Sequence, residues 1–286
     1  MGRVPRAVRS GTKAVLARLA GPARGSRPRV LMYHSVDRSG SLISVSPERF
    51  CQQLEWLRAW GWKTLTLSEA FGPSRSEWGR AVVLTFDDGF ANVYTEVFPL
   101  LRRFGMTATV FLVTDFVGGQ AGWHARDRDV VEGIVASLPA TVGDRAAHLD
   151  RLVRMAREPM LSWSQIREMG EAGIEFGGHT ASHPFLPDLP PARTEDEIRR
   201  STAAIADALG AAPRFFAYPY GADTPAARAC LRAVGCAAAF TAGPAKRVEG
   251  PLDSLAEPRV GIPGWQGKAD FRFRLSRAFD RWQAAR

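Results

Sequence analysis

The chain has 286 residues, of which 45% are hydrophobic and 23% are charged. This is the balance of a globular protein with a sizeable core, and it excludes a largely disordered or fibrous chain. The net charge of +9 would suit a polyanionic partner, but the arginines are spread thinly and no aromatic residues accompany the basic N-terminal stretch. Nucleic acid is therefore not an expected partner.

The N-terminal stretch concentrates basic residues, because no acidic residue precedes Asp37. We expect residues 1–28 to form a flexible arm or a surface helix that makes at most weak contact with an anionic membrane surface. Its apolar part, residues 14–21, is interrupted by Arg18 and is too short to cross a bilayer or to make a clear signal peptide. A cytoplasmic or peripheral membrane location is thus favoured over secretion, and nothing indicates the oligomeric state.

Beyond the arm, apolar runs alternate with amphipathic segments up to the C-terminus. The segment 46–62 illustrates a helix signal, because Ser46 can cap it and Pro47 suits the first helical position. The predicted strands are 29–36, 64–67, 82–86, 106–114, 174–180, 214–221, 237–243 and 258–263, and the predicted helices are 46–62, 93–105, 161–173, 194–210 and 224–235. This alternation predicts a parallel sheet covered by helices, in a closed or nearly closed barrel.

One region does not follow the alternation. Residues 118–158 are polar, charged and weakly helical, which indicates an excursion from the barrel. No linker divides the rest of the chain, so we expect a single domain over residues 29–286.

Chemically reactive side chains follow the predicted strands rather than precede them. In parallel β/α folds, the loops after the strands form the face that holds the site. The residues that this rule gathers are His34, Asp87, Asp88, His179, His183, Tyr218 and Tyr220.

Two histidines and two aspartates among these residues suggest a metal centre. On one helical turn, His179 and His183 would lie on the same side and could reach one ion. With a carboxylate from Asp87 or Asp88 they would make a set suited to zinc, cobalt or nickel, and the second carboxylate could act as a base. Taken singly, each motif has a simpler reading, because an Asp-Asp-Gly tripeptide is common in turns.

The motifs TFDDG (residues 85–89), HTASH (179–183) and YPYG (218–221) together resemble those of the polysaccharide deacetylase family, also known as the NodB homology or carbohydrate esterase 4 group. The resemblance implies a distorted (β/α) barrel of about seven parallel strands that uses one divalent metal ion, often zinc. It also implies removal of N-acetyl groups from the amino sugars of a polysaccharide or glycoconjugate. By motif position, it implies Asp87 as general base, the backbone N–H of Tyr220 as oxyanion donor, and Asp88, His179 and His183 as metal ligands.

The chain departs from the family pattern at two places. Ala217 stands where many members carry an arginine that tethers the catalytic aspartate, and no histidine follows His183 to act as the usual general acid. The segment LMYHSV resembles the circularly permuted poly-N-acetylglucosamine deacetylase branch, which makes His34 the candidate acid. Arg259, placed by the sequence near the end of the last strand, is the candidate replacement for the arginine.

Aromatic residues suit the apolar faces of sugar rings, and we expect Tyr218, Trp163 and Phe185 to bind the N-acetylated polysaccharide or oligosaccharide substrate, with Trp123 and Trp265 as further candidates. Two other functions fit the same sequence. One is a carbohydrate-binding relative with weakened catalysis, and the other is an amidase that acts on a small non-sugar amide.

Overall fold

The computed structural model describes residues 28–72, 79–137, 144–242, 253–276, 278–279 and 282. The predicted basic arm lies outside these residues except for its last position, Pro28. Across the described residues, no helix combines the length and the apolar character needed to cross a bilayer.

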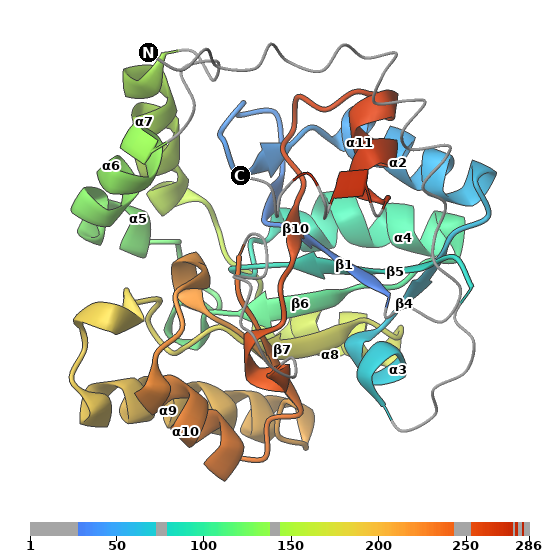
Figure 1. The fold of residues 1–286 in the computed structure, drawn as a ribbon. Helices are drawn as coiled ribbons and strands as arrows, with labels where there is room; N and C mark the ends of the chain where they lie inside the picture. Colours follow the sequence, from blue (N-terminus) through green and yellow to red (C-terminus); the bar gives the residue numbers. More distant parts are fainter. Residues whose placement is uncertain are drawn as a thin grey trace.

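The core of the fold is a curled sheet in which every strand pairing is parallel (Figure 1). Its order is β10-β1-β5-β6-β7-β8-β9, and β4 pairs with the first half of β5. The strands of this sheet are β1 (Arg29–Tyr33), β4 (Lys63–Leu65), β5 (Ala81–Phe86), β6 (Thr109–Leu112), β7 (Glu175–Gly178), β8 (Phe215–Ala217), β9 (Ala238–Phe240) and β10 (Val260–Gly261). A separate pair, β2 (Ser35–Val36) and β3 (Ser44–Val45), follows β1.

Helices connect the strands and cover the outside of the sheet. In Figure 1, α2, α4 and α11 lie along one side of the sheet, α9 and α10 lie along the other, and α5, α6 and α7 form a group set apart from both. The helices are α2 (Pro47–Ala59), α3 (Leu67–Phe71), α4 (Phe98–Phe104), α5 (Trp123–Arg126), α6 (Arg128–Ser137), α7 (Arg145–Arg154), α8 (Trp163–Glu171), α9 (Pro191–Leu209), α10 (Pro225–Ala233) and α11 (Lys268–Arg274). One turn of π-helix, Val93–Val97, leads into α4.

The central strand β5 is buried along its whole length. Its side chains alternate between two apolar clusters, as the two-residue period of a strand requires. Val82 and Leu84 join the large cluster that contains residues of α2, α4 and α8, whereas Val83 joins a smaller cluster with Phe111 and Phe240. Burial on both faces explains why this strand reads as an uninterrupted apolar run.

The two edge strands of the sheet, β9 and β10, do not pair with each other as regular strands. Instead, a single parallel bridge joins Phe240 of β9 to Glu257, just before β10, with backbone hydrogen bonds of 2.9 and 3.0 Å on the two sides of Glu257. The sheet is therefore curled into a barrel that is only partly closed. The predicted fold, a distorted (β/α) barrel of about seven parallel strands in a single domain, is confirmed.

Most predicted elements are present, and the differences are local. The predicted strand 64–67 ends at Leu65, because Thr66 and Glu69 form a capping box that begins α3. Helix α11, near the C-terminus, was not predicted. The predicted excursion contains α5, α6 and α7, which lie between β6 and β7 in the chain.

Candidate active site

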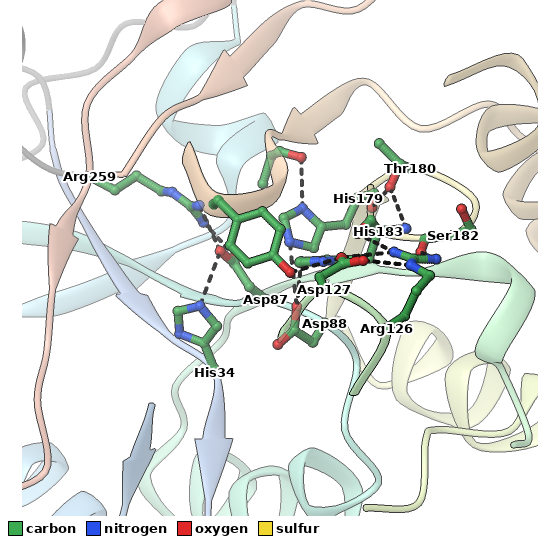
Figure 2. A network of polar contacts seen from close by, with 12 residues as sticks. His34, Asp87, Asp88, Arg126, Asp127, His179, Thr180, Ser182, His183 and Arg259 are labelled. Atoms are coloured by element: carbon green, nitrogen blue, oxygen red, sulfur yellow. Dashed lines mark hydrogen bonds and ion pairs between the residues drawn. The ribbon is translucent and has the colours of Figure 1, made fainter. Parts of the chain in front are cut away.

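Polar residues that follow β1, β5 and β7 converge at one end of the barrel (Figure 2). His34 follows β1, the two aspartates follow β5, and His179 follows β7. Parallel strands end at the same edge, so segments far apart in the chain meet there.

The backbone after β5 explains how two adjacent carboxylates reach one site. Asp87 continues the strand, but Asp88 has a φ of 73° and Gly89 a φ of 85°, so the chain turns out of the strand at once. On a regular strand, neighbouring side chains would point to opposite faces. Because Asp88 adopts the left-handed conformation instead, both carboxylates lie at the same end of the barrel.

Asp88 forms a compact cluster with two histidines. Its Oδ1 lies 3.5 Å from Nε2 of His179 and 3.4 Å from Nε2 of His183, and all three residues are buried. One ligand atom from each residue lies within 4.8 Å of the other two. Tetrahedral ligands about 2.0–2.1 Å from a zinc ion stand roughly 3.3–3.4 Å apart, so these separations suit a single small cation.

The hydrogen bonds around the cluster also fit a metal. Nδ1 of His179 donates to the carbonyl of Ala217 at 2.7 Å, which leaves the lone pair of Nε2 facing Asp88. Among the described residues, Oδ1 of Asp88 has no hydrogen-bond donor despite its burial. Burial also lowers the pKa of His183 well below its ordinary value, so this imidazole is neutral and able to bind a cation. The donor set therefore fits a divalent metal.

Asp87 is held by the guanidinium of Arg259. Nη1 and Nη2 of Arg259 donate to Oδ1 and Oδ2 of Asp87 at 2.6 and 2.7 Å, and Arg259 is almost completely buried. Burial by itself would raise the pKa of Asp87, but the charge and the hydrogen bonds of Arg259, with contributions from His179 and His34, together hold the pKa below its ordinary value. Asp87 is therefore an ionised carboxylate with a defined orientation.

His34 is the most accessible residue of the group. Its Nε2 lies 3.9 Å from Oδ2 of Asp87, and 23% of its side chain is exposed. The ring stands beside the carboxylate of Asp87 (Figure 2). It is placed where an incoming molecule could reach it.

Tyr220 follows β8 and completes the group with its backbone. It has a φ of 57°, and its ring packs edge-on against the ring of His183 at 4.8 Å. In the described part of the chain, the non-glycine residues with positive φ are Asp88, Thr180, His183 and Tyr220. Such conformations cost on the order of 1–3 kcal/mol each and persist only where the surrounding contacts enforce them. All of them lie in this site.

Residues 75–239, more than half of the chain, match the sequence profile of the polysaccharide deacetylase family. The chain belongs to this family. The Escherichia coli (strain K12) poly-β-1,6-N-acetyl-D-glucosamine N-deacetylase is 27% identical over 266 residues, which cover 81% of this chain and 36% of that protein. The Bacillus subtilis (strain 168) protein YxkH is 25% identical over 245 residues, covering 84% of this chain and 73% of YxkH.

The fold of this family member is also that of solved deacetylase structures. IcaB from Ammonifex degensii superposes with a TM-score of 0.64 and 28% identity, covering 91% of this chain and 98% of IcaB. The chain thus spans nearly the whole length of IcaB but about a third of the E. coli enzyme. The resemblance to polysaccharide deacetylases expected from the motifs is confirmed.

This polysaccharide deacetylase family member has Ala217 where many members carry the arginine that tethers the catalytic aspartate. The structure shows how Arg259 takes its place. Ala217 is fully buried beside Phe111 and Phe240 inside the barrel. Arg259 enters the same interior from the start of β10 rather than from the end of the last strand, which corrects the position expected from the sequence. Its guanidinium lies 5.4 Å from the centre of the Phe111 ring and donates hydrogen bonds to the carboxylate of Asp87.

The three predicted substrate-binding residues of this family member lie in different surroundings. Tyr218 is fully buried and its hydroxyl donates to the carbonyl of Leu255 at 2.8 Å, so its predicted contact with substrate is not supported. Trp163 is partly buried against the main core, and its predicted role is untested. Phe185 lines a cavity of about 470 Å³ together with Tyr220 and residues of α6, which keeps it a candidate.

Sequence reasoning missed the contribution of α5. Trp123, considered as a sugar platform, is fully buried and stacks on the ring of His183 at 5.0 Å. His124 is buried beside it, and burial lowers its pKa. Arg126 and Asp127 also reach the site (Figure 2). The only sequence signal was the local run WHARD, inside a segment that is polar, charged and only weakly helical.

Proposed function

We propose that this chain is a metal-dependent N-deacetylase that hydrolyses N-acetyl groups on the amino sugars of a polysaccharide or glycoconjugate. One observation carries the proposal: a buried Asp-His-His cluster stands directly beside a second aspartate that is ionised and held in place by Arg259. Membership of the polysaccharide deacetylase family and the names of its relatives support the same substrate class.

Asp88, His179 and His183 would hold the ion, for which zinc is the best match, with cobalt or nickel as alternatives. When bound, a divalent ion polarises a carbonyl and lowers the pKa of water beside it.

In this proposal, Asp87 accepts a proton from the water that attacks the acetyl carbonyl. The fork of Arg259 keeps the carboxylate ionised and aimed, so that its free lone pairs face the water rather than the barrel interior. As the carbonyl carbon becomes tetrahedral, its oxygen gains negative charge, and the backbone N–H of Tyr220 donates to it. A donor of this kind contributes about 2.7–4 kcal/mol in other acyl-transfer enzymes.

His34 acts last, by protonating the nitrogen of the departing amine. Its partly exposed position beside Asp87 suits this step, because a general acid must reach the nitrogen of the bound amide. Acetate and a free amino sugar leave the site.

Acetate release from N-acetylglucosamine oligomers tests the proposal. We expect the zinc-loaded protein to release acetate, a chelator to abolish the release, and added zinc to restore it. Asp87→Asn should lower the rate by roughly 10²–10⁴-fold. Unchanged release in this variant would contradict the role of Asp87 as the base. Release that survives complete chelation would contradict the dependence on a metal ion. No release by the loaded protein from any oligomer would contradict N-deacetylation.

A further inference from the structure

Arg126 and Asp127, at the end of α5, contact the loop that carries His183 and the turn that carries Tyr220. The two residues form a paired fork: Nε and Nη2 of Arg126 donate to the two carboxylate oxygens of Asp127 at 2.6 and 2.8 Å. Each member then has a second partner in the site, so the pair is not an isolated surface contact.

Arg126 holds the backbone of the histidine loop. Its Nη1 donates to the carbonyl of Ser182 and its Nη2 to the carbonyl of His183, both at 2.9 Å. From the other side, the buried carboxylate of Glu197 accepts from the N–H and the hydroxyl of Ser182, both at 2.8 Å. Arg126 from α5 and Glu197 from α9, which carry opposite charges, therefore hold Ser182, the residue before His183.

Asp127 holds the other side of the site. Its Oδ2 accepts a hydrogen bond from the hydroxyl of Tyr220 at 3.0 Å. His183 and Tyr220 both have left-handed backbones, with φ of 58° and 57°, and both are bound by this one ion pair. Strained conformations of this kind need external contacts to persist.

We propose that Arg126 and Asp127 act as a positioning clamp, which fixes the direction of the His183 ring and the place of the Tyr220 backbone at the same time. The clamp rests on the proposed function, because it gives His183 its ligand geometry and Tyr220 its donor geometry. Neither residue of the clamp touches the reacting atoms. The excursion from the barrel thereby contributes to the site, because α5 brings this ion pair to the loop that carries His183.

Zinc affinity separates this role from a general effect on folding. In Arg126→Met, the two carbonyls lose their donors, and we expect zinc alone to bind roughly 10–100-fold more weakly, as for other groups that orient metal ligands. Competition with a chromogenic chelator measures this without any turnover. Arg128→Met is the matched control, because Arg128 lies two residues away, carries the same charge, and pairs with Glu132 on the surface. It should bind zinc as wild type does.

Turnover gives a second readout. At saturating zinc, Arg126→Met should show a lower kcat for acetate release with a nearly unchanged KM, because the clamp acts on the histidine and tyrosine rather than on the sugar. Arg126→Lys keeps the charge and an ammonium donor but loses the planar fork, so it should recover part of the zinc affinity. A loss of stability alone would not produce this order of affinities among folded variants.

The outcomes are distinct. If wild type binds none of zinc, cobalt and nickel, the proposed function fails. If wild type binds zinc and Arg126→Met binds it equally tightly, the clamp is overturned while the proposed function stands. Should Arg126→Met not fold, Asp127→Asn carries the test, because it keeps an oxygen for Tyr220 but loses the paired fork. Wild-type zinc affinity in a folded Asp127→Asn protein would then overturn the clamp.

Discussion

At the scale of single residues, the two adjacent aspartates have separate surroundings although they share one peptide bond. Asp87 faces a buried guanidinium, and Asp88 faces two imidazoles. Burial alone would raise the pKa of Asp87, but the charge and hydrogen bonds of Arg259 and the nearby histidines together lower it. The surroundings of each aspartate are thus provided by specific partners. Changing a partner should therefore change the behaviour of that aspartate in a predictable direction.

Replacing Arg259 tests the control of Asp87. Arg259→Met removes a charge that lowers the pKa of Asp87, so that pKa should rise. A base with a raised pKa is protonated at higher pH, so the acidic limb of the pH profile of kcat/KM should move upward. Arg259→Lys keeps the charge but loses the fork, and should lower kcat with a smaller shift of the limb. An unmoved limb in the methionine variant would contradict the assignment.

His34 can be tested separately from the metal. His34→Ala should lower kcat by roughly 10²–10⁴-fold, the usual contribution of a general acid or base. Its zinc content, measured on the purified protein, should equal that of wild type, because His34 is not in the Asp-His-His cluster. A variant that keeps its zinc and its full rate would show that another group protonates the amine.

At the scale of elements, strand β7 shows how packing inside the barrel shapes the site. Gly177 lies two residues before His179, and a Cβ there would stand 2.6 Å from the ring of Phe111 and 2.8 Å from the carbonyl of Phe215. A side chain at position 177 would push β7 away from β6 and β8. The glycine therefore lets β7 approach its neighbours closely enough to deliver His179 to the aspartates.

Gly177→Ala is expected to destabilise the protein by about 1–3 kcal/mol, because ring and backbone must both shift to make room. Gly133→Ala is the matched control, since a Cβ at that position in α6 meets no atom within 4 Å. It should leave stability unchanged or raise it by about 0.4–1 kcal/mol. Thermal unfolding of the two variants measures the contrast. Equal melting temperatures would show that β7 can move without cost.

At the scale of the whole molecule, the Asp-His-His cluster joins β5 to the segment after β7, and Trp123 of α5 stacks on His183 of that segment. A ligand that binds only the folded state stabilises all of these connections together. Linkage predicts a gain of about 2.7 kcal/mol when free zinc is 100 times its Kd. The gain should shrink at acidic pH, because protonated imidazoles do not bind metal.

We therefore expect zinc to raise the melting temperature of the wild-type protein and to have little effect on Asp88→Asn. Calcium, which takes six to eight oxygen ligands, should give no rise with two imidazoles and one carboxylate. Differential scanning calorimetry with each ion makes the comparison. A rise of equal size with calcium, or in Asp88→Asn, would place the stabilising ion elsewhere.

Much of this arrangement was predictable from the sequence. The order of strands and helices, the barrel, and the convergence of Asp87, Asp88, His179 and His183 follow from local periodicity and from the rule that parallel strands end together. Both signals are written within short segments, because the apolar pattern of each strand or helix fixes which of its faces is buried.

The tertiary structure decided the direction of the supporting contacts. Arg259, a candidate partner of Asp87 from the sequence, reaches it from just before β10 rather than from the end of that strand. Arg126 reaches His183 from the excursion, and Tyr218 turns into the core rather than toward the cavity. The physical reason is that these contacts depend on the length and direction of side chains across a packed interior. That geometry exists only once the strands have closed around it.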